Sequence, residues 1–350
     1  MRTSILLLIL FINCLSFSAC QIDPEIVCPR VAFAEPTGPI QKICFGSCGK
    51  ETKEQPILNT IVNDKPDLFI YLGDNIYGDT KDMSVLKAKY NKLGCKTEFQ
   101  NLFASCRVLA TWDDHDYGQN DAGINYPMKN ESKEIFLDFW KEPSVSDRRN
   151  HEGIYTSYYY GDDAHKVQVI LLDCRTFRSD LKNGINGYEE DFDSCSTMLG
   201  TAQWQWLEQE LQKPAVFRII CSSTQFARTH VGYEAWANMP LQVEKMKNLI
   251  TTTHANGVVF ISGDIHLAEL SKLDNAGSYP IYDMTSSGLT QLEKSNPSNS
   301  NRIGDLYDSY NYGILEFDWT NSDPSITLGA KDIRGNSVIQ KKIMLSEISH

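Results

Sequence analysis

Short hydrophobic runs that end in polar residues recur along the chain. One of them, "DLFIYLGDNIYGD", passes from a hydrophobic segment directly into a Gly-Asp pair. Short hydrophobic runs that are bounded by Gly or polar residues are typical of buried strands. We therefore predict strands within residues 42–50, 67–79, 107–116, 166–175, 217–225 and 257–266.

Helical patterns lie between these runs. Trp204, Leu207 and Leu211 fall on one face of a helix, and Thr201 suits its N-cap position. Amphipathic patterns of this kind predict helices at residues 131–140, 201–211 and 241–250. Strands that alternate with helices predict a layered α/β fold. In such folds the polar residues at the carboxyl ends of the strands meet at one edge, where ligands bind.

The C-terminal third has a different pattern. Residues 275–312 are rich in Ser, Asn, Gly and Tyr, which predicts a loop. The segments that follow alternate as antiparallel strands do, at residues 312–319, 325–332 and 337–345. We expect these strands to complete the edge of a sheet and not to form a separate domain.

The N-terminus resembles an export signal. Arg2 precedes a hydrophobic stretch, residues 5–12, that is too short to span a bilayer, and the small residues Ser18 and Ala19 follow it. Ser18-Ala19-Cys20 also resembles a bacterial lipobox, although Phe17 replaces the usual aliphatic residue. We expect an exported protein, either a periplasmic, outer-membrane or cell-surface lipoprotein anchored through Cys20, or a secreted protein after simple cleavage.

Charge and cysteine content narrow the function. The formal net charge is −12, from 33 basic and 45 acidic residues. The sequence contains no basic cluster, so we expect no binding to a nucleic-acid polymer. An exported chain permits disulfides, and Cys95, Cys174 and Cys195 are candidates, but spacing alone does not give their pairing.

Metal-ligating residue types follow three of the predicted strands. "GDNIY" offers Asp74, "DDHD" offers Asp114 and His115, and "GDIH" offers Asp264 and His266. A single Gly-Asp pair is common turn chemistry. The joint occurrence of all three at strand ends is more specific, because crowded carboxylates repel one another unless protons or cations offset their charge. The pattern favours a metal site.

These motifs resemble the PhoD-like (alkaline phosphatase D) branch of the calcineurin-type metallophosphoesterases. The matching stretches include "FGSCGK", "YLGDNIYGD", "TWDDHDYGQNDAG", "VQVILLDCRTFRS", "GVVFISGDIHLAEL" and "YPIYDMTSSGL", and they span roughly residues 42–290. The resemblance implies a four-layer α/β/β/α sandwich of two mixed sheets flanked by helices. With the export pattern at residues 1–19 and a short segment at residues 20–41, the resemblance implies a PhoD-like catalytic domain at residues 42–350. Larger relatives carry a β-rich domain before the catalytic core, which we expect to be absent here.

The resemblance implies a site that pairs ferric iron (Fe3+) with calcium (Ca2+). Asp74 would bridge the two metals, and Cys48 and Tyr77 would ligate the iron. Thiolate and phenolate ligands suit ferric iron. Two alternatives remain open from the residues alone. Cys48 could be a buried thiol or half of a disulfide with Cys28 or Cys44, and Tyr77 could simply pack.

The calcium side would take its ligands from Asn120, Asp264 and His266, since amide and carboxylate oxygens suit calcium. Asp114 and His115 stand where related enzymes carry an Asn-His pair. By that analogy Asp114 would be a metal ligand or would support one, and His115 would be a general acid or a phosphate contact.

Arg175 has two interpretations. Its guanidinium group could bind the phosphate of the substrate in a bidentate way, or it could pair with a carboxylate such as Asp173.

We therefore expect an exported, monomeric, metal-dependent hydrolase of phosphate esters. The alternative is a catalytically silent surface protein that binds metal or phosphorylated ligands. The retention of Asp74, His115, Asp264 and His266 favours the enzyme. A serine hydrolase is disfavoured because the sequence contains no GxSxG motif.

Overall fold

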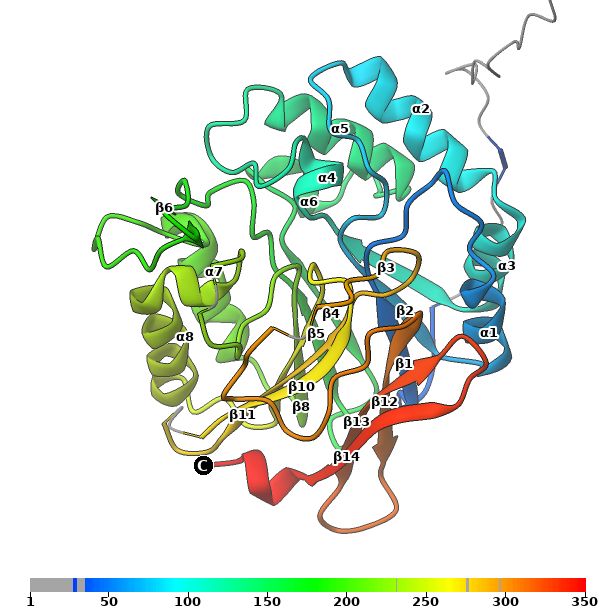
Figure 1. Cartoon of the computed structure of the whole chain (residues 1–350). Helices are drawn as coiled ribbons and strands as arrows, with labels where there is room; N and C mark the ends of the chain where they lie inside the picture. The colour runs from blue at the N-terminus through cyan, green and yellow to red at the C-terminus, as the bar shows by residue number, and fades with distance from the viewer. Residues whose placement is uncertain (1–27, 30–34, 231, 275–276, 296) are drawn as a thin grey trace, which may run out of the picture.

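Two six-stranded sheets form the centre of the molecule (Figure 1). The computed structural model describes residues 28–29, 35–230, 232–274, 277–295 and 297–350. The expected signal peptide at residues 1–19 and the lipidation site Cys20 lie outside the described residues.

The first sheet has the strand order β14-β13-β12-β1-β2-β3. Strands β1, β2 and β3 run parallel, whereas β12, β13 and β14 join them in antiparallel fashion. The predicted C-terminal strands thus complete a sheet that the N-terminal strands begin. The strand bounds are β1 Lys42–Gly46, β2 Leu68–Leu72, β3 Arg107–Thr111, β12 Asn311–Asp318, β13 Ser325–Asp332 and β14 Ser337–Met344.

The second sheet has the strand order β10-β11-β9-β8-β5-β4. Its four central strands are parallel, and the two edge strands β10 and β4 are antiparallel. A small hairpin, β6 Asn183–Gly184 with β7 Gly187–Tyr188, lies outside both sheets. The strand bounds are β4 Thr156–Tyr160, β5 Val167–Leu171, β8 Phe217–Ser222, β9 Val258–Ser262, β10 Ala268–Leu273 and β11 Ile281–Ser286.

Strand β11 corrects the prediction of a loop over residues 275–312. It is buried along its whole length between β9 and β10. Its polar residues Asp283 and Thr285 hydrogen-bond with Ser262 of β9, at 2.7 and 2.8 Å. Buried polar groups normally form hydrogen bonds with partners inside the fold. Polar residue types in this segment are therefore compatible with a buried strand, and they do not indicate a loop.

Helices cover the outer face of each sheet. Helices α1, α2, α3 and α5 pack on the first sheet, and α7 and α8 pack on the second (Figure 1). This arrangement confirms the four-layer α/β/β/α sandwich. The helix bounds are α1 Ile57–Asn63, α2 Met83–Gly94, α3 Thr97–Ser105, α4 Asp114–Tyr117, α5 Lys129–Phe139, α6 Asp147–Asn150, α7 Gly200–Leu211, α8 Pro240–Thr252, and the 3-10 helices η1 Trp236–Asn238 and η2 Leu345–Ile348.

The predicted helices at residues 131–140, 201–211 and 241–250 correspond to α5, α7 and α8. The predicted N-cap is wrong, because α7 begins at Gly200 and Thr201 lies inside it. The hydroxyl of Thr197 accepts the backbone N–H of Gly200 at 2.9 Å instead.

Alternate residues of the central strands enter two different cores. In β2, Leu68, Ile70 and Leu72 face the second sheet, whereas Phe69 and Tyr71 face the helices. This period of two is the geometry of a strand. Because β2 is buried on both faces, it reads as a continuous hydrophobic run in the sequence.

Cys28 forms a disulfide with Cys95, which confirms that Cys95 is one of the bonded cysteines. The expectation is wrong for Cys174, which is a buried free thiol, and for Cys195, which is an exposed one. Among the described helices, none has the length and hydrophobicity that a membrane crossing requires.

Candidate metal centre and active site

Side chains from the carboxyl ends of both sheets meet in a row of ligand atoms. Most of them lie in the segments after β1, β2, β3 and β9, as the pattern of strand ends predicts, whereas Glu234 lies between β8 and η1. Within each of three groups the ligand atoms lie within 4.8 Å of one another. The groups are Cys48 with Asp74 and His266, Asp74 with Asp114 and His115, and Asp114 with Asp121 and Glu234. Asp74 and Asp114 each belong to two groups, so the row is continuous.

Several of these residues have left-handed backbone conformations. The φ angles are 61° at Cys48, 51° at Asp74, 76° at Asp264 and 62° at His266. Non-glycine residues rarely adopt such angles, and those that do gather at functional sites, where the surrounding fold holds them. Gly73, with φ of 102°, allows the chain to turn where a Cβ atom would meet the backbone nitrogen of Asp113 at 2.6 Å.

Cys48, Tyr77 and His266 surround one end of the row. The Sγ atom of Cys48 lies 3.5 Å from Asp74 Oδ2 and 3.6 Å from the carbonyl oxygen of Asp264. The hydroxyl of Tyr77 lies 3.2 Å from Nε2 of His266. Cys48 is a free, buried thiol, so it forms no disulfide with Cys28 or Cys44. His266 therefore lies beside the thiol of Cys48 and the phenol of Tyr77, whereas the resemblance groups it with Asp264 on the calcium side.

Burial and neighbouring carboxylates raise the pKa of acidic groups at this end of the row. Burial and the nearby carboxylate of Asp114 raise the pKa of Asp74 well above its ordinary value. Burial and the carboxylate of Asp74 likewise raise the pKa of the Cys48 thiol. The Oδ1 atom of Asp74 is buried, and none of the described residues donates a hydrogen bond to it. Buried polar atoms normally have a partner, so the donor set fits a multivalent cation, which would supply both the partner and the charge.

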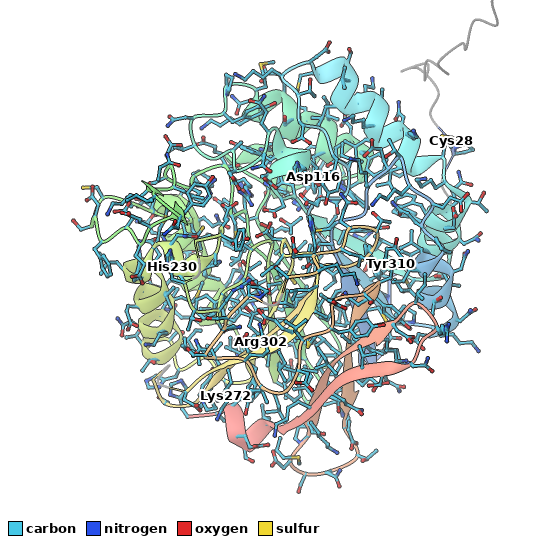
Figure 2. All side chains as sticks on the ribbon, in the orientation of Figure 1. Cys28, Asp116, His230, Lys272, Arg302 and Tyr310 are labelled. Atoms are coloured by element: carbon cyan, nitrogen blue, oxygen red, sulfur yellow. A yellow bond between two sulfur atoms is a disulfide. The ribbon has the colours of Figure 1, made fainter. Side chains whose placement is uncertain are left out.

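Asp116 anchors the turns that carry the ligands. Within α4 (Figure 2), its carboxylate accepts the backbone N–H groups of Asp113, Asp74 and Asn75 at 2.6, 3.2 and 3.3 Å. It also accepts the hydroxyl of Tyr90 at 3.2 Å. One side chain thus fixes the end of β3 against the end of β2. The sequence pattern alone predicts no role for Asp116.

His115 is held at the edge of the row. Its Nδ1 lies 2.7 Å from Asp79 Oδ1, and its ring lies 4.3 Å from the ring of Tyr77 between centroids. Burial disfavours the charged imidazolium, but the hydrogen bond to Asp79 and the carboxylates of Asp74 and Asp114 outweigh it and raise the pKa of His115 to about 10.

Arg175 is fully buried behind the row. Its Nε donates to Asp113 Oδ1 at 2.6 Å, and one terminal nitrogen donates to both oxygens of Glu234 at 2.8 Å. Arg178 also pairs with Glu234, at 3.0 Å. The guanidinium of Arg175 thus pairs with carboxylates, as the second interpretation expects. Asp173 is not one of them, because its bond with Arg175 comes from the backbone N–H of Arg175, at 2.9 Å.

Asn120 and Asp264 line a cavity of about 260 Å³ beside the row. Asn120 is exposed, and its amide donates to Asp121 Oδ2 at 2.7 Å. Burial and the carboxylates of Asp113 and Glu234 raise the pKa of Asp264. Both residues are therefore near the other ligands, at the open side of the centre.

Sequence reasoning missed Asp113, Asp121 and Glu234. Asp113 and Asp121 lie within the acidic stretch 111–121 that drew attention to the site, so their residue type was the available signal. Glu234 follows no predicted strand and belongs to no motif, and only the fold brings it to Arg175.

Comparison with known proteins agrees with this geometry. The sequence model of the PhoD-like phosphatase family matches residues 44–310. The chain belongs to this family, a family of metal-dependent phosphatases. Alkaline phosphatase D of Bacillus subtilis (strain 168) is 26% identical over 283 residues, which are 67% of this chain and 47% of that protein. The chain therefore spans about half the length of this PhoD-like relative.

Solved structures share the fold. A structure of PhoD has a TM-score of 0.66 at 17% identity, and the match covers 89% of this chain and 73% of that one. A dimetal phosphatase from Danio rerio has a TM-score of 0.53 at 12% identity, covering 88% and 99%. GAP50, the anchor in the inner membrane complex of Plasmodium, has a TM-score of 0.56 at 12% identity, covering 88% and 89%.

Proposed function

We propose that the protein is a phosphoesterase in which bound cations activate water for the hydrolysis of phosphate esters. The observation that carries this proposal is the continuous row of ligand groups, in which a buried oxygen of Asp74 has no partner. The row lies at the carboxyl ends of the strands, where α/β folds bind their ligands. The membership of the chain in the PhoD-like family supports the same reaction class.

The ligands divide into two sets by their chemistry. Cys48, Tyr77 and His266, with an oxygen of Asp74, offer thiolate, phenolate and imidazole, which suit ferric iron. This assignment moves His266 from the calcium set to the iron set, because its imidazole lies against Tyr77.

The calcium set consists of the oxygen ligands. It comprises Asp74, Asp114, Asn120 and Asp264, whose carboxylate and amide oxygens suit calcium. Cations bound at the two sets would polarise the phosphate oxygens and lower the pKa of a bound water.

The residues around the centre orient the substrate and move protons. His115, held by Asp79, is the proposed proton donor to the leaving alcohol. We assign Arg175 to positioning and not to phosphate contact, because its guanidinium is buried against Asp113 and Glu234. Asp116 would keep the ligand-bearing turns in register.

We further propose that the protein is exported and monomeric, with Cys20 as a site of lipid anchoring if the lipobox resemblance holds. The Cys28–Cys95 disulfide supports export, because disulfides persist in oxidising compartments. Subcellular fractionation of the wild type and of Cys20→Ala tests the anchor. Loss of membrane association in the variant is the expected result.

The activity test uses bis(p-nitrophenyl) phosphate and p-nitrophenyl phosphate. The metal-loaded protein should hydrolyse at least one of them, and a chelator that removes its metal should abolish the hydrolysis. Asp74→Asn should also abolish it, whereas the matched change Asp163→Asn, at a side chain 98% exposed, should not.

Metal content separates the competing interpretations. Cys48→Ser should lose iron while keeping the fold, as measured by elemental analysis and circular dichroism. Retained metal without hydrolysis of either ester would favour the catalytically silent binding protein. Full hydrolysis after verified metal removal would refute the metal mechanism.

A further inference from the structure

The cavity beside the metal centre has a wall unlike the metal row. Asp264 and His266, which belong to the proposed metal sets, line it together with Tyr188, Tyr233 and Glu293. A substrate whose phosphate sits at the row would place one of its alcohol groups in this cavity. The charge and the aromatic groups of the wall then determine which alcohol binds best.

Four carboxylates among the described residues line the cavity. Glu234 pairs with buried arginines, Asp121 accepts the hydroxyl of Tyr188 at 2.6 Å, and Asp264 belongs to the proposed calcium set. The carboxylate of Glu293 accepts the backbone N–H of Ser295 at 2.7 Å and has no ion pair with Lys or Arg among the described residues.

The lysines near the cavity bind partners outside its wall. Among the described residues that line the cavity, none is Lys or Arg. Lys294, adjacent to Glu293, pairs with Asp308 at 3.5 Å. Lys53 donates to the carbonyl oxygen of Thr290 at 2.9 Å. A second phosphate in the cavity would therefore face Glu293, and the described wall offers it no lysine or arginine.

Two tyrosines complete the wall. The β6–β7 hairpin positions Tyr188, whose backbone N–H donates to the carbonyl oxygen of Gly232 at 2.8 Å. Tyr233 follows Gly232 and is 61% exposed. Aromatic faces beside a carboxylate attract organic cations through their quadrupole and through charge.

We propose that this cavity selects phosphodiesters in which one alcohol is compact and positively charged, over those in which it is neutral or anionic. The inference rests on the proposed phosphoesterase function and names the substrate class of the same site. Glu293 supplies the charge, and Tyr188 and Tyr233 supply the aromatic contact.

The test compares three p-nitrophenyl phosphodiesters that differ in the second alcohol. The alcohols are choline, its neutral isostere 3,3-dimethylbutanol, and the anion 3-hydroxypropanoate. All three release p-nitrophenol, so the ratios of kcat/KM report interactions of the second alcohol. The metal-loaded wild type should prefer the choline ester to the neutral ester by about tenfold, and the anionic ester should be the poorest.

Variants locate the preference. Glu293→Gln should reduce the ratio of choline to neutral ester to about threefold and should improve the anionic ester relative to the neutral one. Tyr233→Leu, at an exposed position, should also reduce the ratio. Glu190→Gln makes the same change of net charge outside the cavity and should leave the ratio as in the wild type.

Three equal values of kcat/KM would overturn the inference while leaving the phosphoesterase function intact. The inference would also be overturned if Glu190→Gln changed the ratio of choline to neutral ester as much as Glu293→Gln does. The preference would then come from long-range charge and not from the cavity. Failure of the metal-loaded protein to hydrolyse any ester would overturn the proposed function together with the inference.

Discussion

Removing the charge of Arg175 should destabilise the fold strongly. Its guanidinium is 0% exposed and holds Asp113 and Glu234, which are also buried. One such pair is worth about 4 kcal/mol at a charge separation of about 4 Å and an effective dielectric constant of about 20. Desolvation of the arginine offsets much of this gain in the native protein. Arg175→Gln, however, leaves the buried carboxylate of Asp113 without its cation and leaves Glu234 with Arg178 alone, which costs about 3–5 kcal/mol.

That loss is a large part of a total stability of about 5–15 kcal/mol. Urea unfolding followed by tryptophan fluorescence measures it. Arg175→Lys should cost less than Arg175→Gln, because lysine keeps the charge but lacks the fork that reaches both carboxylates. Lys129→Gln is the matched control, since its ion pair with Glu152 is at the surface and worth about 0–1 kcal/mol.

The opposite pattern would refute this reasoning. If Arg175 contacted the substrate phosphate, Arg175→Gln would leave the free energy of unfolding within about 1 kcal/mol of the wild type and would mainly raise KM. An unchanged unfolding midpoint together with a raised KM would thus restore the phosphate contact as the role of this residue.

Three further predictions concern two supports of the centre, Gly73 and Asp116, and the Cys28–Cys95 disulfide. Gly73→Ala should destabilise the protein by about 1–3 kcal/mol, because φ is 102° there and the backbone of Asp113 is close; thermal unfolding measures it. Asp116→Asn should lower the free energy of unfolding by about 2 kcal/mol, because an amide cannot accept all the N–H groups that the carboxylate holds. It should also lower kcat more than it changes KM. Unchanged stability together with an unchanged kcat would contradict this prediction. Cys95→Ser should lower stability by up to about 4 kcal/mol, since the disulfide closes a loop with a sequence separation of 67, whereas Cys195→Ser, at an exposed free thiol, should have little effect in the same urea titration.

The sequence predicts the features that depend on local pattern. A buried strand followed by a polar turn is visible in a single run, so Asp74, Asp114 and His266 could be placed at strand ends before the fold was known. Their meeting follows because the carboxyl ends of strands share an edge. The layered architecture is accessible for the same reason.

Features that depend on distant partners could not be predicted in this way. The pairing of Arg175 with Glu234, and that of Cys28 with Cys95, joins residues with no shared motif. The sequence pattern predicts a loop at β11 because its polar side chains find their partners in distant segments, among them Ser262 of β9 and the backbone N–H groups of Phe226 and Ala227. The residue types were present in the sequence, but the contacts that give them meaning are set by the tertiary fold.

The position of β1 within its sheet has a consequence for biosynthesis. One neighbour, β2, follows it closely, but the other is β12, where Cys44 pairs with Ile314. Contacts of such long sequence range form late and slowly. Until β12 has been synthesised, β1 has an open edge, and the turn that carries Cys48 is not held between two strands. We therefore expect the metal ligands to assemble only after most of the chain has left the ribosome, so that metal is acquired by the finished protein and not by the nascent one.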